Sequence, residues 1–131
     1  MNVNAGDYLA KSQPPQTMRT HGIIAGTVAQ LLTAYVLSEG TWKKLQRELG
    51  LSEQACRKLV GYIVSLHDIG KLAKKNQNAL SGKGVIGQLP RHEKTTAFCL
   101  RKIWGDCAAA DLYANILGAH HQGKNGDRAA L

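Results

Sequence analysis

Apolar residues recur at helical spacing over several stretches of the chain, and Gly, Pro and small polar residues separate these stretches. The first helix is expected to begin near residues 18–20, capped by Thr17 or Thr20, and to run to about residue 38. Its apolar stripe, which we expect to face the core, consists of Ile24, Val28, Leu31, Leu32 and Tyr35. His21 falls on this stripe, because it lies three residues before Ile24.

Capping residues and glycines predict two further helices in the middle of the chain. Thr41 is expected to cap a short helix over residues 42–49, which Gly50 closes. Ser52 is expected to cap a third helix, with Glu53 in its first turn, and this helix ends at the adjacent residues His67 and Asp68.

The second half of the chain begins with glycine-rich sequence and then returns to helical spacing. Residues 70–90 contain four glycines and Pro90, which predicts a loop with one helical turn over residues 72–80. A fourth helix is expected from Pro90 to about residue 104, with His92, Thr95 or Thr96, Cys99 and Ile103 inward, and a fifth over residues 108–120, with Leu112, Ile116 and Ala119 inward. No stretch alternates like a strand, and residues 1–20 are expected to be irregular. The pattern predicts an all-α bundle of about five to six helices in a single domain over residues 1–131.

Composition narrows the class of protein. With 44% hydrophobic and 20% charged residues, the chain is typical of folded domains rather than disordered segments. The sequence has no apolar run of about 18–20 residues and no signal peptide, so no membrane partner and a cytoplasmic location are expected. The three cysteines form no Cys-x-x-Cys motif and are expected to be reduced and buried. The net charge of +8 favours an anionic partner, nucleic acid first.

The adjacent His67 and Asp68 form the first candidate for chemistry. Neighbouring side chains on a helix point about 100° apart, so the pair is expected to serve two metal positions, with the carboxylate bridging them. Imidazole nitrogen and carboxylate oxygen suit Zn, Fe, Co, Ni or Mn. Taken alone, such a pair is also typical of a capped, solvated helix end.

All five histidines fall at ends of predicted helices, which scattered surface histidines would not do so consistently. They are His21, His67, His92, His120 and His121. Each one singly has a plainer interpretation, as a histidine at a helix start or on the surface. Together with Asp68 they provide six candidate ligands, enough for two ions that share one carboxylate, and we prefer this interpretation of the set.

A window without acidic residues separates Asp68 from Glu93. Its cations are Lys71, Lys74, Lys75, Lys83 and Arg91, and we expect them to bind the phosphate backbone of a single strand. Three interpretations of Lys71 stay open. It could bind a phosphate oxygen, pair with a ligand carboxylate, or stabilise the C-terminal end of a helix by its interaction with the helix dipole.

The order of these motifs resembles the HD nuclease domain of type I CRISPR systems. The resemblance rests on His21, on residues 67–71 (HDIGK), on residues 91–93 (RHE) and on His120-His121. Residues 8–12 (YLAKS) are also similar to the aromatic-Ala-Lys-Ser stretch of that family, and Gln77 falls where the family has Phe-Gln. The similarity extends from about residue 8 to residue 123.

The resemblance implies a set of functional residues and partners. The implied metal ligands are His21, His67, Asp68, His92, His120 and His121. The candidate catalytic residues are Asp68 and His67, with Lys71 added because it lies three residues after Asp68. Asp68 would bridge two ions, with His92, His120 and His121 at one and His21 at the other. The implied cofactors are one or two divalent transition metal ions, Mn, Ni, Co, Fe or Zn in preference to Mg. The implied function is cleavage of single-stranded DNA in a prokaryotic cytoplasm, together with a helicase subunit or domain and an RNA-guided CRISPR targeting complex.

One departure from this family pattern is serious. HD proteins generally complete the first metal site with an acidic residue far downstream in the sequence. In this chain the only acid after His121 is Asp127, which follows His121 more closely than the family spacing requires. We therefore expect either a chain truncated at its C-terminus or a reduced form with a weakened first site and lower activity. Two alternative functions stay open: an HD phosphohydrolase that acts on nucleotides, and a degenerate HD module with weak or no catalysis.

Overall fold

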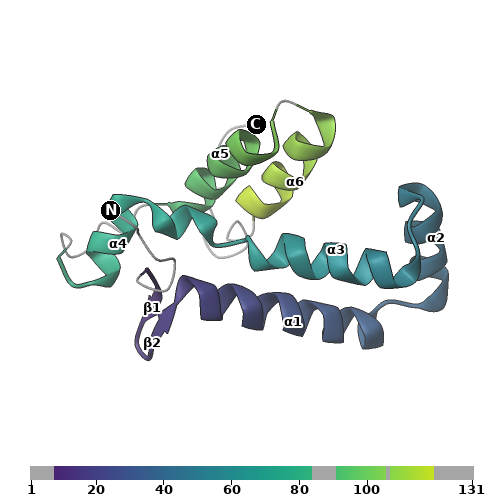
Figure 1. The fold of residues 1–131 in the computed structure, drawn as a ribbon, viewed down its shortest axis with the longest axis horizontal. Helices are drawn as coiled ribbons and strands as arrows, with labels where there is room; N and C mark the ends of the chain where they lie inside the picture. Colours follow the sequence, from purple (N-terminus) through teal and green to yellow (C-terminus); the bar gives the residue numbers. More distant parts are fainter. Residues whose placement is uncertain (1–7, 84–90, 106, 120–131) are drawn as a thin grey trace, which may run out of the picture.

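The computed structural model describes residues 8–83, 91–105 and 107–119, and most of these residues are helical (Figure 1). This part of the chain contains six α-helices, one 3-10 helix and one two-stranded sheet. The elements in order are β1 (Leu9–Ser12), β2 (Pro15–Thr17), α1 (Met18–Val36), α2 (Glu39–Leu49), α3 (Glu53–Ser65), η2 (Ile69–Leu72), α4 (Lys74–Leu80), α5 (His92–Trp104) and α6 (Ala108–Gly118). The prediction of an all-α fold with about five to six helices is confirmed.

Helices α1 and α3 lie side by side, and α2 connects them at one end of the molecule (Figure 1). At the other end the β1–β2 hairpin leads into α1, and η2 follows α3. The helices α5 and α6 pack together, α5 contacts η2, and the core of this pair packs against the end of α3. The start of α1, the end of α3 and the start of α5 therefore meet at the hairpin end of the molecule.

The predicted caps are mostly observed. The Thr17 hydroxyl accepts from the Thr20 N–H at 3.1 Å, Ser52 accepts from Ala55 N–H at 3.3 Å, and Gly50 ends α2 with φ of 63°. The predicted start of α2 was wrong, because Ser38 caps this helix and Thr41 lies inside its first turn. Ser38 is as good a cap as Thr41, and the acidic Glu39 that follows it favours a helix start there.

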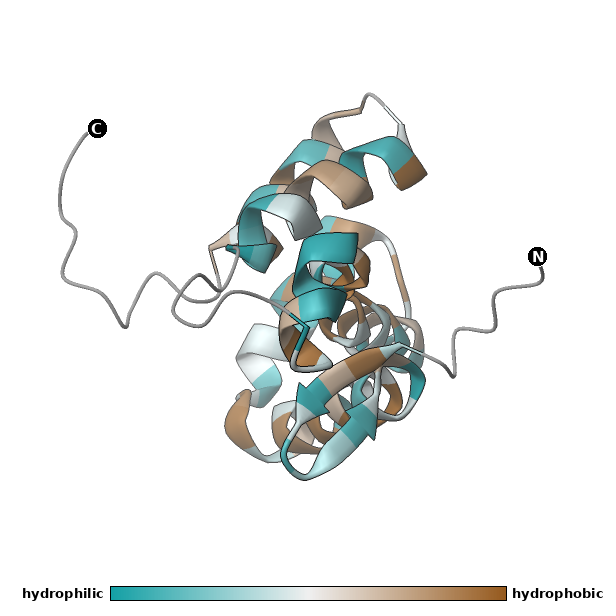
Figure 2. Cartoon of the chain, turned by 90° about the vertical axis from the view of Figure 1, so that its left-hand side faces the viewer, coloured by the Kyte–Doolittle hydropathy of each residue, from teal (hydrophilic) through white to brown (hydrophobic). Residues whose placement is uncertain are grey.

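The β-hairpin contradicts the prediction that residues 1–20 are irregular and that the chain has no strands. The strands β1 and β2 are antiparallel, with Lys11 opposite Gln16 and Ser12 opposite Pro15. With four and three residues, they are too short to show alternation in the sequence. Figure 2 faces this end of the molecule and shows that the hairpin carries hydrophilic as well as hydrophobic residues.

The buried core lies between α5, α6 and the end of α3. Its centre is formed by Leu100, Ala114 and Leu117, against which Ile63, Leu66 and Ile69 pack. Within the described residues, no helix combines the length and the hydropathy that crossing a bilayer requires.

The predicted burial of the α1 stripe was wrong. Its residues are between 44% and 86% exposed, and they are Ile24, Val28, Leu31, Leu32 and Tyr35. Helix α1 instead contacts α3 through Gly22 and Gly26, which are buried. A Cβ on Gly26 would lie 2.6 Å from the Gly61 carbonyl oxygen, so the glycine face allows an approach that the apolar stripe could not make.

Three other predicted inward positions are also exposed. Ile103, Leu112 and Ile116 are between 54% and 58% exposed. Among the cysteines, Cys56 is buried as predicted, whereas Cys107 is exposed and its sulfur accepts from the Ala110 N–H at 3.4 Å. Cys107 therefore caps α6 instead of filling the core.

Candidate metal centre

The adjacent His67 and Asp68 lie in a turn between two helices. Helix α3 ends at Ser65, and the backbone N–H groups of His67 and Ile69 donate to Val64 O and Leu66 O at 3.1 and 3.0 Å. Because the pair lies outside regular helix, its side chains are not held 100° apart. His67 Nε2 lies 3.3 Å from Asp68 Oδ2, so the imidazole and this one oxygen of the carboxylate face the same position.

A close contact between η2 and α5 brings His92 to the same place. Gly70 N–H donates to Thr96 Oγ1 at 3.0 Å, and this hydroxyl donates to His67 O at 3.1 Å. A Cβ on Gly70 would overlap the His92 carbonyl oxygen, so only glycine permits this approach. His92 Nε2 consequently lies 2.9 Å from Asp68 Oδ1.

His21 completes the arrangement from the first turn of α1. Its Nε2 lies 3.0 Å from Asp68 Oδ2, and its ring centroid is 5.2 Å from that of His67. Three imidazole Nε2 atoms from three elements therefore surround the two oxygens of Asp68, a side chain that is only 4% exposed. His21 and His67 lie at Oδ2, and His92 lies at Oδ1.

The Nδ1 atoms of His21 and His67 face acceptors outside this cluster. His21 Nδ1 lies 2.9 Å from Gln16 Oε1, and His67 Nδ1 lies 2.8 Å from Val64 O. At His21 the oxygen acceptor requires N–H at Nδ1, which leaves the Nε2 lone pair of the neutral ring directed toward Asp68. A lone pair that faces a carboxylate is favourable only with a cation or a proton between them.

The donor atoms fit a divalent transition metal. One ligand atom from each of His21, His67 and Asp68 can be chosen so that all lie within 4.8 Å of one another. His21 Nε2 is also buried and makes no hydrogen bond within the described part of the chain. Imidazole nitrogen and carboxylate oxygen are ligands of Zn, Mn, Co, Ni and Fe, so these three residues can hold an ion.

The protonation states agree with such a role. Burial raises the pKa of Asp68, but hydrogen bonds from His67, His92 and Lys71 outweigh it and hold this pKa far below its usual value. Burial lowers the pKa of His21, whereas the hydrogen bond with Asp68 raises the pKa of His67. At pH 7 the centre therefore contains an ionised Asp68 and a neutral His21.

Lys71 faces the same carboxylate. Its Nζ lies 2.7 Å from Asp68 Oδ2 and donates to Ala10 O at 3.2 Å. Of the three interpretations of Lys71, this geometry favours pairing with a ligand carboxylate. Ala10 belongs to β1, so the lysine also connects the hairpin to the centre.

Gln77 makes a second connection to the hairpin. Its Oε1 accepts from Leu9 N–H at 2.9 Å, and its Nε2 donates to Leu9 O at 2.8 Å and to Lys71 O at 2.7 Å. One amide side chain thus joins β1, η2 and α4. The sequence indicated Gln77 only through the family resemblance.

The remaining predicted site residues divide into two groups. Lys74, Lys75, Lys83 and Arg91 are exposed, the first two in the first turn of α4, which packs against β1 and η2. His120, His121 and Asp127 lie outside the described residues. Sequence reasoning missed the contribution of Gln16 and the bridging role of Thr96, since neither belongs to a motif; Thr96 was recognised only as one of two inward candidates.

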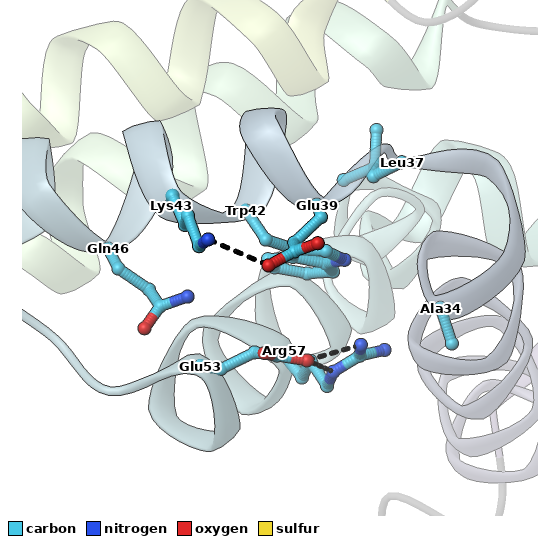
Figure 3. Close-up of a pocket in the computed structure, with 8 residues that line it drawn as sticks. All are labelled: Ala34, Leu37, Glu39, Trp42, Lys43, Gln46, Glu53 and Arg57. Atoms are coloured by element: carbon cyan, nitrogen blue, oxygen red, sulfur yellow. Dashed lines mark hydrogen bonds and ion pairs between the residues drawn. The ribbon is translucent and has the colours of Figure 1, made fainter.

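A separate pocket of about 290 Å³ lies at the opposite end of the molecule, between α2, α3 and the end of α1 (Figure 3). Arg57 lies over the ring of Trp42, 4.5 Å from its centroid, and is paired with Glu53, while Lys43 pairs with Glu39. No histidine lines this pocket. In each of these two ion pairs the opposite charges compensate each other. The pocket forms no part of the metal centre.

A His–Asp pair in the turn after a helix, joined by histidines from two other helices around one buried carboxylate, defines the HD class of hydrolase domains. The family model described as "Cas3, HD domain" matches residues 9–130. The chain therefore belongs to the family of Cas3 HD domains, and it is a CRISPR-associated HD nuclease domain. No curated protein and no solved structure matches the chain significantly. The resemblance seen in the motifs is confirmed.

Proposed function

We propose that the chain, acting as a single domain, is a metal-dependent phosphodiesterase that cleaves single-stranded DNA in type I CRISPR interference. It would work with a helicase subunit or domain and an RNA-guided targeting complex. The observation that carries this proposal is the convergence of three imidazole Nε2 atoms on both oxygens of Asp68. The net charge of +8 supports an anionic polymer as substrate.

The proposed ligand assignment follows the two sides of the Asp68 carboxylate. His21 and His67 would hold one ion at Oδ2, and His92 would hold a second at Oδ1 together with His120 and His121. An ion of Mn, Ni, Co, Fe or Zn supplies positive charge for the scissile phosphate and lowers the pKa of water.

The protein side chains have distinct tasks in this proposal. Lys71, fixed by Ala10 O, holds the Asp68 carboxylate in its orientation. The exposed cations Lys74, Lys75, Lys83 and Arg91 would contact the phosphate backbone of the strand. Because few aromatic residues lie in this region of the sequence for base stacking, the cleavage should depend little on base sequence.

The test offers three substrates to protein purified with Mn²⁺, Ni²⁺ or Co²⁺: circular single-stranded DNA, duplex DNA and deoxynucleoside triphosphates. We expect nicking of the circle and a loss of at least about 100-fold in Asp68→Ala, since loss of a ligand should exceed the effect of losing its supporting contacts. Asp111→Ala, at an exposed acid of α6, is the matched control and should retain activity. Phosphate products from the nucleotides alone would support a nucleotide phosphohydrolase. Metal binding without any reaction would support a non-catalytic module.

A further inference from the structure

Gln16 contacts His21 from outside the helix that carries it. Gln16 belongs to β2, is partly buried, and places its Oε1 2.9 Å from His21 Nδ1. The opposite ring nitrogen, Nε2, lies 3.0 Å from Asp68 Oδ2. The imidazole therefore lies between an amide oxygen at Nδ1 and the metal-centre carboxylate at Nε2.

This contact determines which nitrogen of His21 can bind a metal ion. A neutral imidazole carries one hydrogen, and a carbonyl oxygen of an amide can only accept it. With the hydrogen at Nδ1, the Nε2 lone pair is available on the side of Asp68. Without Gln16, the hydrogen can move to Nε2 and the ring can rotate, and both changes remove the ligand atom from its position.

The hairpin keeps Gln16 in place relative to the Asp68 turn. Gln16 pairs with Lys11 of β1, and the neighbouring Leu9 is bonded through both its N–H and its carbonyl to the Gln77 side chain. Gln77 also donates to Lys71 O, in the 3-10 helix that begins directly after Asp68. The position of Gln16 is thus fixed to the element that presents the carboxylate.

We propose that Gln16 is a positioning residue of the metal centre, which holds His21 with its hydrogen at Nδ1 and its Nε2 directed at an ion on the Oδ2 side of Asp68. The inference rests on the proposed function, because it requires that an ion binds there. It gives the β1–β2 hairpin a role in metal binding. Supporting contacts of this kind change metal affinity by about 10–100-fold when they are removed.

The first experiment compares metal binding by calorimetry, with Mn²⁺ as the probe at about pH 8, in the wild-type protein and three variants. Gln16→Met keeps the length of the side chain but removes the acceptor, and should weaken binding about 10–100-fold. Gln16→Glu keeps an acceptor oxygen and should bind at least as tightly as wild type. Gln54→Met makes the same change at an exposed position of α3 and should bind as wild type.

The second experiment measures the tautomer of His21 in the metal-free protein by long-range ¹H–¹⁵N NMR at the same pH. We expect the hydrogen at Nδ1 in the wild type and a shift toward Nε2 in Gln16→Met, while circular dichroism shows both to be folded. A merely structural role for Gln16 would leave the tautomer unchanged.

The outcomes separate the inference from the proposed function. Wild-type protein that binds no ion would refute both. Wild-type protein that binds Mn²⁺ while Gln16→Met binds equally well, or retains the hydrogen at Nδ1, would overturn the inference and leave the proposed function standing.

Discussion

Replacing Thr96 with valine removes a single hydroxyl from the contact between α5 and the turn that carries Asp68. Thr96 has 0% exposure, and its Oγ1 accepts from Gly70 N–H at 3.0 Å and donates to His67 O at 3.1 Å. Valine has nearly the same shape, so the change creates no large cavity. The effect should come from two backbone groups that lose their hydrogen-bond partner.

The magnitude follows from the burial of these two groups. A buried donor left without a partner costs about 1–3 kcal/mol, and the lost bond to His67 O adds about 1 kcal/mol. We therefore expect Thr96→Val to lower the free energy of unfolding by about 2–4 kcal/mol. With a urea m-value of about 2 kcal/mol/M, the unfolding midpoint should fall by about 1–2 M.

The assay is urea unfolding followed by circular dichroism, in buffer with a chelator so that metal binding does not contribute. Thr95→Val is the matched control, since Thr95 is one residue earlier in α5 and only partly buried, and it should change stability by less than about 0.5 kcal/mol. Thr96→Ser keeps the hydroxyl and should recover most of the loss. A midpoint for Thr96→Val within error of the wild type, at unchanged m-value, would refute the proposed role of this hydroxyl.

Two further predictions concern the same turn. Gly70→Ala should destabilise the protein by at least about 2 kcal/mol in urea unfolding, because its Cβ would overlap backbone atoms that cannot move aside. Gly40→Ala in α2 is its control, because a Cβ there would make only an ordinary contact with Ser38 Oγ at 3.9 Å, and it should be neutral or stabilising by up to about 1 kcal/mol. Equal effects at both glycines would contradict the reasoning. The lowered pKa of Asp68 means that the unfolded chain binds the proton first, so metal-free protein should lose stability as the pH falls below about 4. Asp68→Asn should lack this part of the pH dependence, and parallel curves for both proteins between pH 3 and 6 would disprove it.

The helices could be predicted because their determinants are local. Thr17, Ser52 and Gly50 act at the positions where the sequence places them, since a cap needs only a side-chain oxygen or a left-handed residue at the right place. The hairpin could not be predicted in this way. It is stabilised partly by Gln77, which is 68 residues from Leu9 in the chain, and no local pattern encodes that contact.

The burial of α1 shows a limit of apolar periodicity. The stripe of α1 predicts a helix correctly, but the surface that packs on α3 is the glycine face with Gly22 and Gly26. Close backbone approach there takes precedence over burial of large side chains. This choice has a consequence for the site, because it brings His21, the neighbour of Gly22, to a ring-centroid distance of 5.2 Å from His67.

The candidate ligands of the site could be predicted from the sequence, but the residues that hold these ligands in position could not. His21, His67, Asp68 and His92 are marked by residue type and by their positions at helix ends, and the structure brings all four together. Gln16 and Thr96 belong to common residue types without a motif. Their contribution depends on the hairpin and on the contact at Gly70, which arise only from the tertiary fold.

The charges around Asp68 connect the proposed ion with an anionic substrate. The positive charge of Lys71 compensates the negative charge of Asp68. Glu93 adds one negative charge, because its carboxylate lies 3.9 Å from His92 Nδ1. A divalent ion at the centre would leave a net positive charge in a partly buried site, where Coulomb interactions are stronger than in water. A phosphate group would compensate this charge, and the exposed Lys74 and Lys75 on the adjacent helix would extend the positive surface away from the centre. Metal binding and binding of a phosphate backbone should therefore favour each other, so the affinity for single-stranded DNA should be higher with bound metal than without it.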